Sequence, residues 1–357
     1  MVLYLHIGTE KTGTTSIQRF LANNREALAR NGILYPRTPG PANHLALATY
    51  ANKRRGGELW RKMEIATRAD YQDFRAKLKC DLAAEFESCP VPKTIMSNEH
   101  CSSRLKSVEE IEDLRQFLAA FFDDIHILVY LRRQDDFVVS TYSTGIKTGH
   151  TEPLTMPNDA QIARRYDYWE LLSRWAQVFG KDKIICRKFE KGSLIDNDVV
   201  KDALHVLKVE ERAEYERLPD ANFSLDAACL EFLRVMNGHV DPEWKSGRTI
   251  ARLQTLSDGP LIDLPSDDRR ALMERVRDSN ARVAQEYFGG ELTDSDDPLF
   301  RPRSDNRPRN SEHGLDVDKA IAIASKLLVL RAAAQAEGRG RRRVIQQSAD
   351  ARPEQTD

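Results

Sequence analysis

Residues 2–15 read VLYLHIGTEKTGTT, an apolar run that leads directly into a loop with two glycines. Gly8 and Gly13 have the spacing of the ATP-binding loop GxxxxGK(S/T), in which a lysine directly follows the second glycine. Here Thr14 takes that place, and the lysine stands between the two glycines as Lys11. The loop is therefore predicted to keep a backbone cradle for phosphate while directing its cation at a different part of the ligand.

The residues around this loop predict a strand–loop–helix unit, as a phosphate cradle requires. Val2–Ile7 is short and apolar, and residues 15–28 carry apolar side chains at helical spacing. Strands and helices continue to alternate as far as residue 207. The further predicted strands are 33–35, 93–97, 125–131 and 183–189, and the further predicted helices are 58–87, 107–121, 137–147 and 166–179. Ser107 and Glu110 have the spacing of a capping box at the start of the helix 107–121. This alternation predicts an α/β fold with three layers and a doubly wound parallel sheet.

Strand patterns fade after residue 207, and the rest of the chain is predicted to be helical. Residues 225–236, 267–287 and 317–334 have helical patterns joined by polar connections, and an arginine-rich stretch follows. We therefore expect a core at residues 1–210, a helical C-terminal part at 211–335 packed on that core, and a disordered basic and polar tail at 336–357.

Composition limits the possible partners. The 357 residues carry a net charge of −1, which argues against general attraction to nucleic acid or an anionic membrane. The five cysteines are an odd number without a CxxC pair, which favours free thiols in a reducing compartment. No leader pattern, metal-ligand spacing or apolar run of about 20 residues is present. We expect a soluble cytoplasmic protein with a small-molecule or glycan partner, and the sequence leaves its oligomeric state open.

Two anion-binding elements are predicted at one edge of the sheet. In the first, the backbone amides of residues 11–15 are expected to donate hydrogen bonds to an anion bound at a helix N-terminus. Thr14 and Thr15 add hydroxyl donors. In the second, Arg132 follows the strand 125–131, and Ser140 comes eight residues later in the next helix. Because ligands of open α/β sheets bind at the carboxyl ends of the strands, the two elements are expected to be neighbours.

These residues resemble the sulfotransferases that use 3′-phosphoadenosine 5′-phosphosulfate (PAPS). The family's 5′-phosphosulfate loop, Lys-(Ser/Thr/Ala)-Gly-Thr-Thr, is matched by residues 11–15, and its 3′-phosphate signature by Arg132, Ser140 and Tyr142. The resemblance covers roughly residues 1–207 and implies the P-loop sulfotransferase fold of a bacterial, carbohydrate-type member. It also implies that the PAPS-binding residues are Gly8, Lys11, Thr12, Gly13, Thr14, Thr15, Arg132 and Ser140. Arg133 is adjacent, so either arginine could hold the 3′-phosphate.

Sulfuryl transfer to an alcohol needs a cation for the departing phosphate and a base for the acceptor hydroxyl. Lys11 is positioned to supply the cation, and the reaction requires no metal. Glu99, the second residue after the strand 93–97, is one candidate general base. His44, after the strand 33–35, is another, and His100 is a third.

The predicted function is sulfuryl transfer from PAPS to a hydroxyl of a carbohydrate or glycolipid. One alternative is a phosphotransferase that uses ATP or GTP with Mg²⁺, but it would need a lysine at Thr14 and an acidic strand end at Arg132. The other is a catalytically silent nucleotide-binding protein. The binding site for the acceptor would be formed by a predicted surface loop at 36–57, by the segment 143–165 and by the C-terminal helices. None of these segments has a sequence pattern that indicates a particular substrate.

Overall fold

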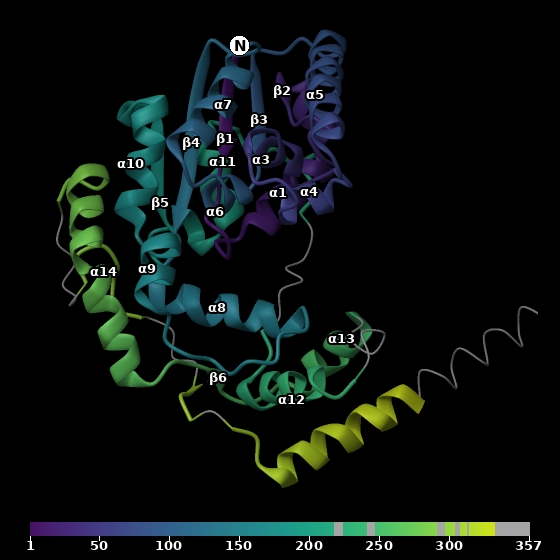
Figure 1. The fold of residues 1–357 in the computed structure, drawn as a ribbon, viewed down its shortest axis with the longest axis vertical. Helices are drawn as coiled ribbons and strands as arrows, with labels where there is room; N and C mark the ends of the chain where they lie inside the picture. The colour runs from purple at the N-terminus through teal and green to yellow at the C-terminus, as the bar shows by residue number, and fades with distance from the viewer. Residues whose placement is uncertain (218–223, 241–246, 291–296, 304–307, 313, 333–357) are drawn as a thin grey trace, which may run out of the picture. The chain divides into compact units, whose positions relative to one another are not determined.

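A five-stranded parallel sheet forms the centre of the computed structural model, which describes residues 1–217, 224–240, 247–290, 297–303, 308–312 and 314–332 (Figure 1). The strand order is β2-β3-β1-β4-β5. The strands are β1 (Val2–His6), β2 (Ile33–Leu34), β3 (Lys93–Ser97), β4 (Asp124–Leu131) and β5 (Ile184–Lys188). All of them lie where the sequence predicted them. The predicted α/β class with a doubly wound parallel sheet is confirmed.

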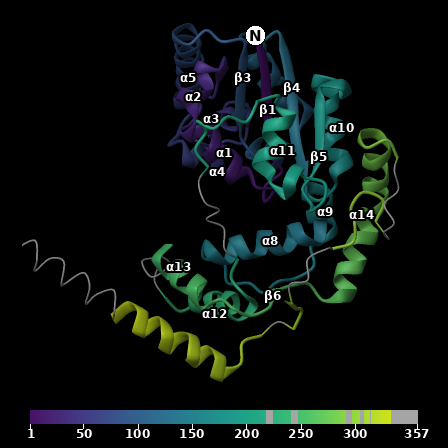
Figure 2. The same cartoon turned by 180° about the vertical axis from the view of Figure 1, so that it is seen from behind.

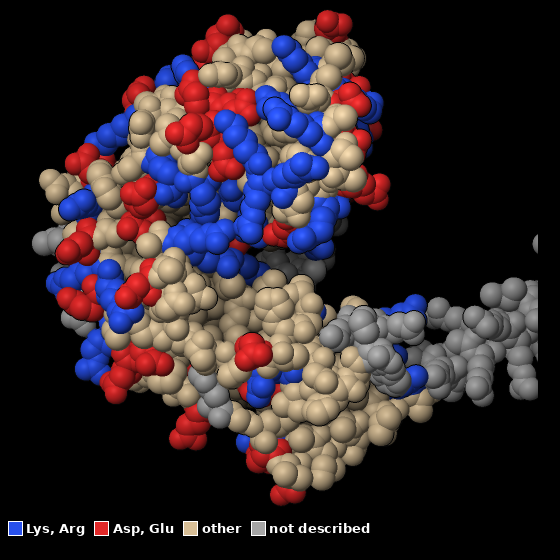
Figure 3. Space-filling model, viewed as in Figure 1, with Lys and Arg blue, Asp and Glu red and all other residues tan. Residues whose placement is uncertain are grey.

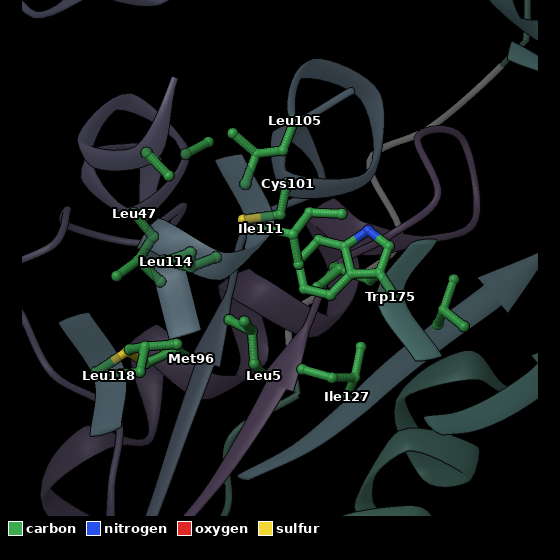
Figure 4. Packing of buried hydrophobic residues seen from close by; sticks show 14 of the residues in the cluster. Leu5, Leu47, Met96, Cys101, Leu105, Ile111, Leu114, Leu118, Ile127 and Trp175 are labelled. Atoms are coloured by element: carbon green, nitrogen blue, oxygen red, sulfur yellow. The ribbon is translucent and has the colours of Figure 1, made fainter. Parts of the chain in front are cut away.

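Alternate side chains of β1 enter two hydrophobic clusters on the two faces of the sheet. Leu3, Leu5 and Ile7 lie in one cluster, and Tyr4 lies in the other. Helices α3 (Leu45–Ala51), α5 (Arg68–Ser88), α7 (Val108–Ala119) and α10 (Tyr168–Phe179) cover the first face (Figures 1 and 4). Helices α1 (Thr14–Asn23), α2 (Arg25–Arg30) and α11 (Val199–Val206) cover the second face (Figure 2). These two helical layers enclose the sheet.

Local sequence signals explain where several helices begin. In α7, the Ser107 side chain accepts a hydrogen bond from the Glu110 N–H, and the Glu110 carboxylate accepts one from the Ser107 N–H, so the predicted capping box is confirmed. The predicted helix 15–28 is broken at Asn24, whose side-chain amide donates to the Phe20 carbonyl at 2.8 Å. The predicted helix 58–87 is likewise divided into α4 (Glu58–Lys62) and α5.

The prediction of a long surface loop at 36–57 was wrong. Helix α3 lies within that stretch, and Leu47, Ala48 and Ala51 are fully buried against the sheet. Proline, glycine and basic residues on both sides obscured a short apolar run, which becomes a helix because the sheet face covers it. Four further helices were not predicted, namely α6 (His100–Arg104), α9 (Asp159–Arg165), α11 and α13 (Gly247–Leu256).

The chain divides into two compact units, and each is assembled from separated stretches. Of the described residues, the first unit contains 1–138, 157–217, 269–290 and 297–303, and the second contains 139–156, 224–240, 247–268, 308–312 and 314–332. The sequence predicted contiguous parts instead. The difference arises because α14 (Ser266–Tyr287) returns to the first unit, where the Ser279 hydroxyl accepts from the Trp169 N–H at 3.0 Å and Asn280 accepts from the Gln134 side chain at 2.7 Å.

The second unit includes α8 (Gln134–Lys147) from Val139 onward, α12 (Ala227–Asn237), α13 and a helix at 317–332. A short parallel pair, β6 (Leu261–Ile262) and β7 (Arg309–Asn310), joins two of its loops. The predicted tail at 336–357 lies outside the described residues. Among the described residues, no helix combines the length and the apolar character needed to cross a bilayer.

Asp202 of α11 should be important for stability because it is fully buried beneath the sheet. Its carboxylate accepts hydrogen bonds from the Tyr130 hydroxyl at 2.7 Å and from Arg187 Nε at 3.0 Å. Asp202→Ala leaves both donors unpaired and should lower the free energy of unfolding by about 3 kcal/mol. Urea unfolding can measure this loss, with Asp81→Ala as the control. Asp81 forms an exposed pair with Lys77, so its removal should cost less than about 0.5 kcal/mol, and equal losses in the two variants would contradict the prediction.

Candidate active site

The glycine loop begins at the carboxyl end of β1 and continues the hydrogen-bonding ladder with β4. The Thr9 N–H donates to the Tyr130 carbonyl at 2.9 Å, and the Tyr130 N–H donates to the Gly8 carbonyl at 2.6 Å. The Thr9 hydroxyl also donates to the Tyr130 carbonyl at 3.0 Å. The start of the loop is therefore fixed to the middle of the sheet.

Both loop glycines have conformations and neighbours that exclude a side chain. Gly13 has a φ of +75°, and a Cβ there would lie 2.7 Å from a methyl group of Val199. Gly8 has a φ of +98°, and its Cβ would lie 2.9 Å from the Cβ of Glu99. The two glycines therefore allow the loop to approach α11 on one side and the end of β3 on the other.

The loop presents unpaired donors at the start of α1. Gly13 is the N-cap residue of α1 and provides no side-chain cap. Within the described part of the chain, no hydrogen bond occupies the backbone N–H groups of residues 11–15. Thr14 is buried and Thr15 is exposed, whereas the buried Thr12 hydroxyl donates within the loop to the Thr9 carbonyl at 2.6 Å. Free amides at a helix N-terminus are suited to bind an anion.

Arg132 is in contact with the loop, and Arg133 is not. Arg132 Nη1 donates to the Lys11 carbonyl at 2.9 Å, and its guanidinium lies 5.8 Å from the centre of the Phe189 ring. Arg133 Nε instead donates to the Asp135 carboxylate at 3.1 Å, and its Nη1 donates to a backbone carbonyl at 3.2 Å. The first predicted anion-binding element and Arg132 of the second are thus brought together.

Ser140 and Tyr142 lie in the part of α8 that belongs to the second unit, which begins at Val139. The Ser140 carbonyl accepts the Thr144 hydroxyl at 3.1 Å, and the Tyr142 hydroxyl donates to Glu231 at 2.5 Å. Burial and the Glu231 carboxylate raise the pKa of Tyr142. A contact between Ser140 and the 3′-phosphate stays a prediction.

Lys11 is partly buried, and groups of both charges act on it. Partial burial lowers the pKa of its ammonium group, and Arg132 lowers it further, while Glu10 and Glu99 act in the opposite direction. No carboxylate among the described residues forms an ion pair with Lys11. Its charge is therefore available to a ligand in the loop.

Glu99 is the second residue after β3, and side-chain amides hold one of its carboxylate oxygens. Gln18 of α1 donates to Glu99 Oε2 at 2.7 Å, and Asn43 donates to the same oxygen at 2.9 Å. The Asn98 amide in turn donates to Asn43 at 3.0 Å. These contacts orient the carboxylate while Oε1 has no hydrogen bond within the described part of the chain. Glu99 thus has the geometry of a positioned proton acceptor.

His44 has both ring nitrogens occupied by backbone groups. Its Nε2 donates to the Pro36 carbonyl at 2.9 Å, and its Nδ1 accepts from the Ser97 N–H at 3.1 Å. The ring is fully buried, which lowers its pKa to about 3. A neutral ring with no free nitrogen favours a structural role for His44. His100 lies with its Nδ1 3.4 Å from a Glu10 oxygen.

Sequence reasoning missed the groups that support these residues. Gln18, Asn43 and Asn98 were not singled out, because each amide finds its partner many positions away in the chain. Glu10 was also missed, although it lies inside the quoted loop. Its carboxylate accepts from the Ser103 hydroxyl at 2.9 Å and pairs with Arg104 and Arg165. Burial raises the pKa of Glu10, but His100 and the two arginines outweigh that effect and hold it well below its usual range.

The chain has only low similarity to the known proteins with which it was compared. No family model matches the chain. An uncharacterized protein from Archaeoglobus fulgidus is 26% identical over 189 residues, which cover 51% of this chain and 51% of that protein. The match thus spans about half the length of this relative. Among solved structures, the crystal structure of a sulfotransferase from Alicyclobacillus acidocaldarius has a TM-score of 0.43 and 14% identity, over 80% of this chain and 95% of that chain.

The two buried histidines of the sheet edge should make stability depend on pH. Burial lowers the pKa of His44 to about 3 and that of His6 to about 4, from 6.5. Both rings are neutral in the folded protein but take up protons in the unfolded chain below pH 6.5. The free energy of unfolding should therefore fall as the pH falls, by about 2 kcal/mol per histidine between pH 7 and pH 5.

Urea unfolding of the wild type and of His44→Gln at both pH values tests this expectation. The variant has lost one titrating ring and should show about half of the wild-type pH dependence. An unchanged pH dependence would contradict the assignment of His44 as a neutral structural ring.

Proposed function

We propose that the protein is a PAPS-dependent sulfotransferase that transfers the sulfuryl group to a hydroxyl of a carbohydrate or glycolipid. The observation that carries the proposal is the contact between Arg132 and the Lys11 carbonyl, at 2.9 Å. It joins an arginine at the end of β4 to a glycine loop whose lysine stands between the glycines. The carbohydrate or glycolipid character of the acceptor comes from the family resemblance.

The donor is proposed to bind in an extended pose over the loop. The free amides of residues 11–15, with Thr14 and Thr15, would hold the 5′-phosphosulfate, and Arg132 with Ser140 would hold the 3′-phosphate. Thr12 would act indirectly, because its hydroxyl closes the loop onto Thr9. Arg132 is favoured over Arg133, which is committed to Asp135.

The chain's own residues would then divide the chemistry. Lys11 would neutralise the negative charge that develops on the 5′-phosphate as its bond to sulfur breaks. Glu99 Oε1 would accept the proton of the acceptor hydroxyl as that oxygen bonds to sulfur. Gln18 and Asn43 would hold Glu99 in the orientation that this transfer requires. The products are the sulfate ester and 3′-phosphoadenosine 5′-phosphate (PAP).

A phosphotransferase is less well supported by the same contacts. Thr14 occupies the place of the lysine that reaches the terminal phosphates in an ATP loop. At the end of β4, Asp135 and Asp136 are already paired with arginines, among them Arg133 and Arg303. These carboxylates are therefore committed within the fold.

Ligand-dependent melting, followed by sulfate transfer from labelled PAPS, tests the function. PAP at 100 times its dissociation constant should stabilise the protein by about 2.7 kcal/mol, and ATP with Mg²⁺ should not.

Lys11→Ala should still be stabilised by PAP, to a smaller extent, but should lose sulfate transfer to a panel of sugar acceptors. The reason is that the variant lacks the cation for the charge that develops on the 5′-phosphate in the transition state. Lys79→Ala, an exposed lysine of α5, is the matched control. Stabilisation by ATP with Mg²⁺ alone, or wild-type transfer by Lys11→Ala, would refute the proposal.

The assignment of Glu99 as the general base is tested by Glu99→Gln. The substitution keeps the size of the side chain, and the glutamine oxygen can still accept a hydrogen bond from Gln18 or Asn43. Transfer from labelled PAPS should slow by about 100-fold or more. PAP melting should be unchanged, since Glu99 is not proposed to touch the donor phosphates. A loss smaller than about tenfold would remove Glu99 from the mechanism.

A further inference from the structure

A small polar pocket with an excess of positive charge lies beside the glycine loop, within the first unit. We call it the basic pocket. Its lining includes Glu10, Lys106, Phe137, Arg164, Arg165 and Arg174. They come from the loop, from the segment after α6 (His100–Arg104), and from α8, α9 and α10. Figure 3 shows lysine and arginine side chains gathered over the part of this face where α6 and α9 lie in Figure 1.

The two carboxylates of the basic pocket are already occupied. Glu10 accepts the Ser103 hydroxyl and pairs with Arg104 and Arg165. Asp167 is the N-cap residue of α10, where it accepts the Glu170 N–H at 2.9 Å and the Ser279 hydroxyl at 2.7 Å. Of the four cationic side chains that line the pocket, Arg165 pairs with Glu10 and Arg174 pairs with Glu170 at 2.8 Å.

Lys106 and Arg164 are the cations that the fold leaves without a counter-charge. The Lys106 ammonium group donates only to backbone carbonyls, those of Ser102 at 3.3 Å and Arg164 at 3.0 Å. Neither side chain forms an ion pair within the described part of the chain. Burial, together with the charges of Arg174, Arg164, Arg104 and Arg165, lowers the pKa of Lys106 to about 8. A bound anion would relieve this mutual repulsion.

The basic pocket is also next to the proposed reaction centre. Thr9 and Glu10 line it, and Lys11 is the next residue of the chain. Arg165, which pairs with Glu10, is one of the cations that lower the pKa of Lys11. Phe137 and Leu171 add apolar surface to the lining. A molecule whose anionic group sits here can thus present a neighbouring hydroxyl toward the loop.

We propose that the basic pocket binds an anionic group of the acceptor, a carboxylate or a phosphate or sulfate ester, and so selects negatively charged hydroxyl compounds. Lys106 and Arg164 are the specificity-determining residues, and Arg165 and Arg174 complete the positive field. This inference rests on the proposed function, whose acceptor class it narrows.

Binding of three matched sugars tests the inference: methyl β-glucoside, methyl β-glucuronide and the 6-phosphate of methyl β-glucoside. Dissociation constants are measured by calorimetry at one fixed salt concentration, with and without saturating PAP. At least one anionic sugar should bind about tenfold or more tightly than the neutral sugar. The two anionic sugars distinguish a carboxylate-binding pocket from one that prefers phosphate.

The variant Lys106→Gln/Arg164→Ala removes two charges while the glutamine amide can still donate to the backbone carbonyls. It should reduce the preference for the anionic sugar about tenfold and leave the PAP melting shift unchanged. The control Lys79→Gln/Arg68→Ala removes two exposed charges of α5 and should keep the preference.

Equal affinity for the neutral and anionic sugars, or a preference that survives in the Lys106→Gln/Arg164→Ala variant, would overturn the inference. Both outcomes leave the donor assignment intact. Failure to bind PAP, with the anion preference still present in the PAP-free titration, would count against the proposed function and not against the basic pocket.

Discussion

Parallel pairing of β1 with β3 on one side and β4 on the other is the constraint on which the candidate site depends. His6 is in register with Ser97 of β3 and with Leu128 of β4, so all three strands end at one edge of the sheet. The ladder extends past the strand ends, where the Asn98 N–H donates to the His6 carbonyl at 2.9 Å and Gly8 pairs with Tyr130. Backbone hydrogen bonds between the strands therefore bring Lys11, Glu99 and Arg132 to the same edge of the sheet.

Much of this edge could be predicted from sequence because its signals are local. The strands, the glycine spacing and the capping box at Ser107 depend on residues that are near each other in the chain. The sequence left the choice between Glu99 and His44 open, because the surroundings of the two side chains depend on contacts between distant segments. The hydrogen bond from Gln18 to Glu99 joins residues 81 positions apart in the chain. The hydrogen bond from the Ser97 N–H to the His44 ring joins residues 53 positions apart. Helix α3 escaped prediction for a related reason, because the sheet face that buries it comes from distant strands.

Glu10 explains how so many cations can gather around one loop. Arg104 and Arg165 both pair with its carboxylate, which stays ionised because its pKa is held well below the usual range. Without that carboxylate, the repulsion between these arginines and Lys11 would oppose the folded loop. One glutamate thus holds the cations in place but leaves the local charge positive, as the proposed anionic donor and the proposed anionic group of the acceptor would both require.

The place of the lysine between the glycines has a conformational cost, and Arg132 offsets part of it. Lys11 has a φ of +66°, a left-handed conformation that costs a residue with a side chain about 1–3 kcal/mol. The hydrogen bond from Arg132 to the Lys11 carbonyl holds that turn in place. Arg132 would therefore act at both ends of the donor, because a 3′-phosphate that orders its guanidinium also orders the loop that carries Lys11. A lysine directly after Gly13 would be the first residue of a right-handed helix and would need no such support. The position of Lys11 between the glycines therefore depends on the arginine at the end of β4.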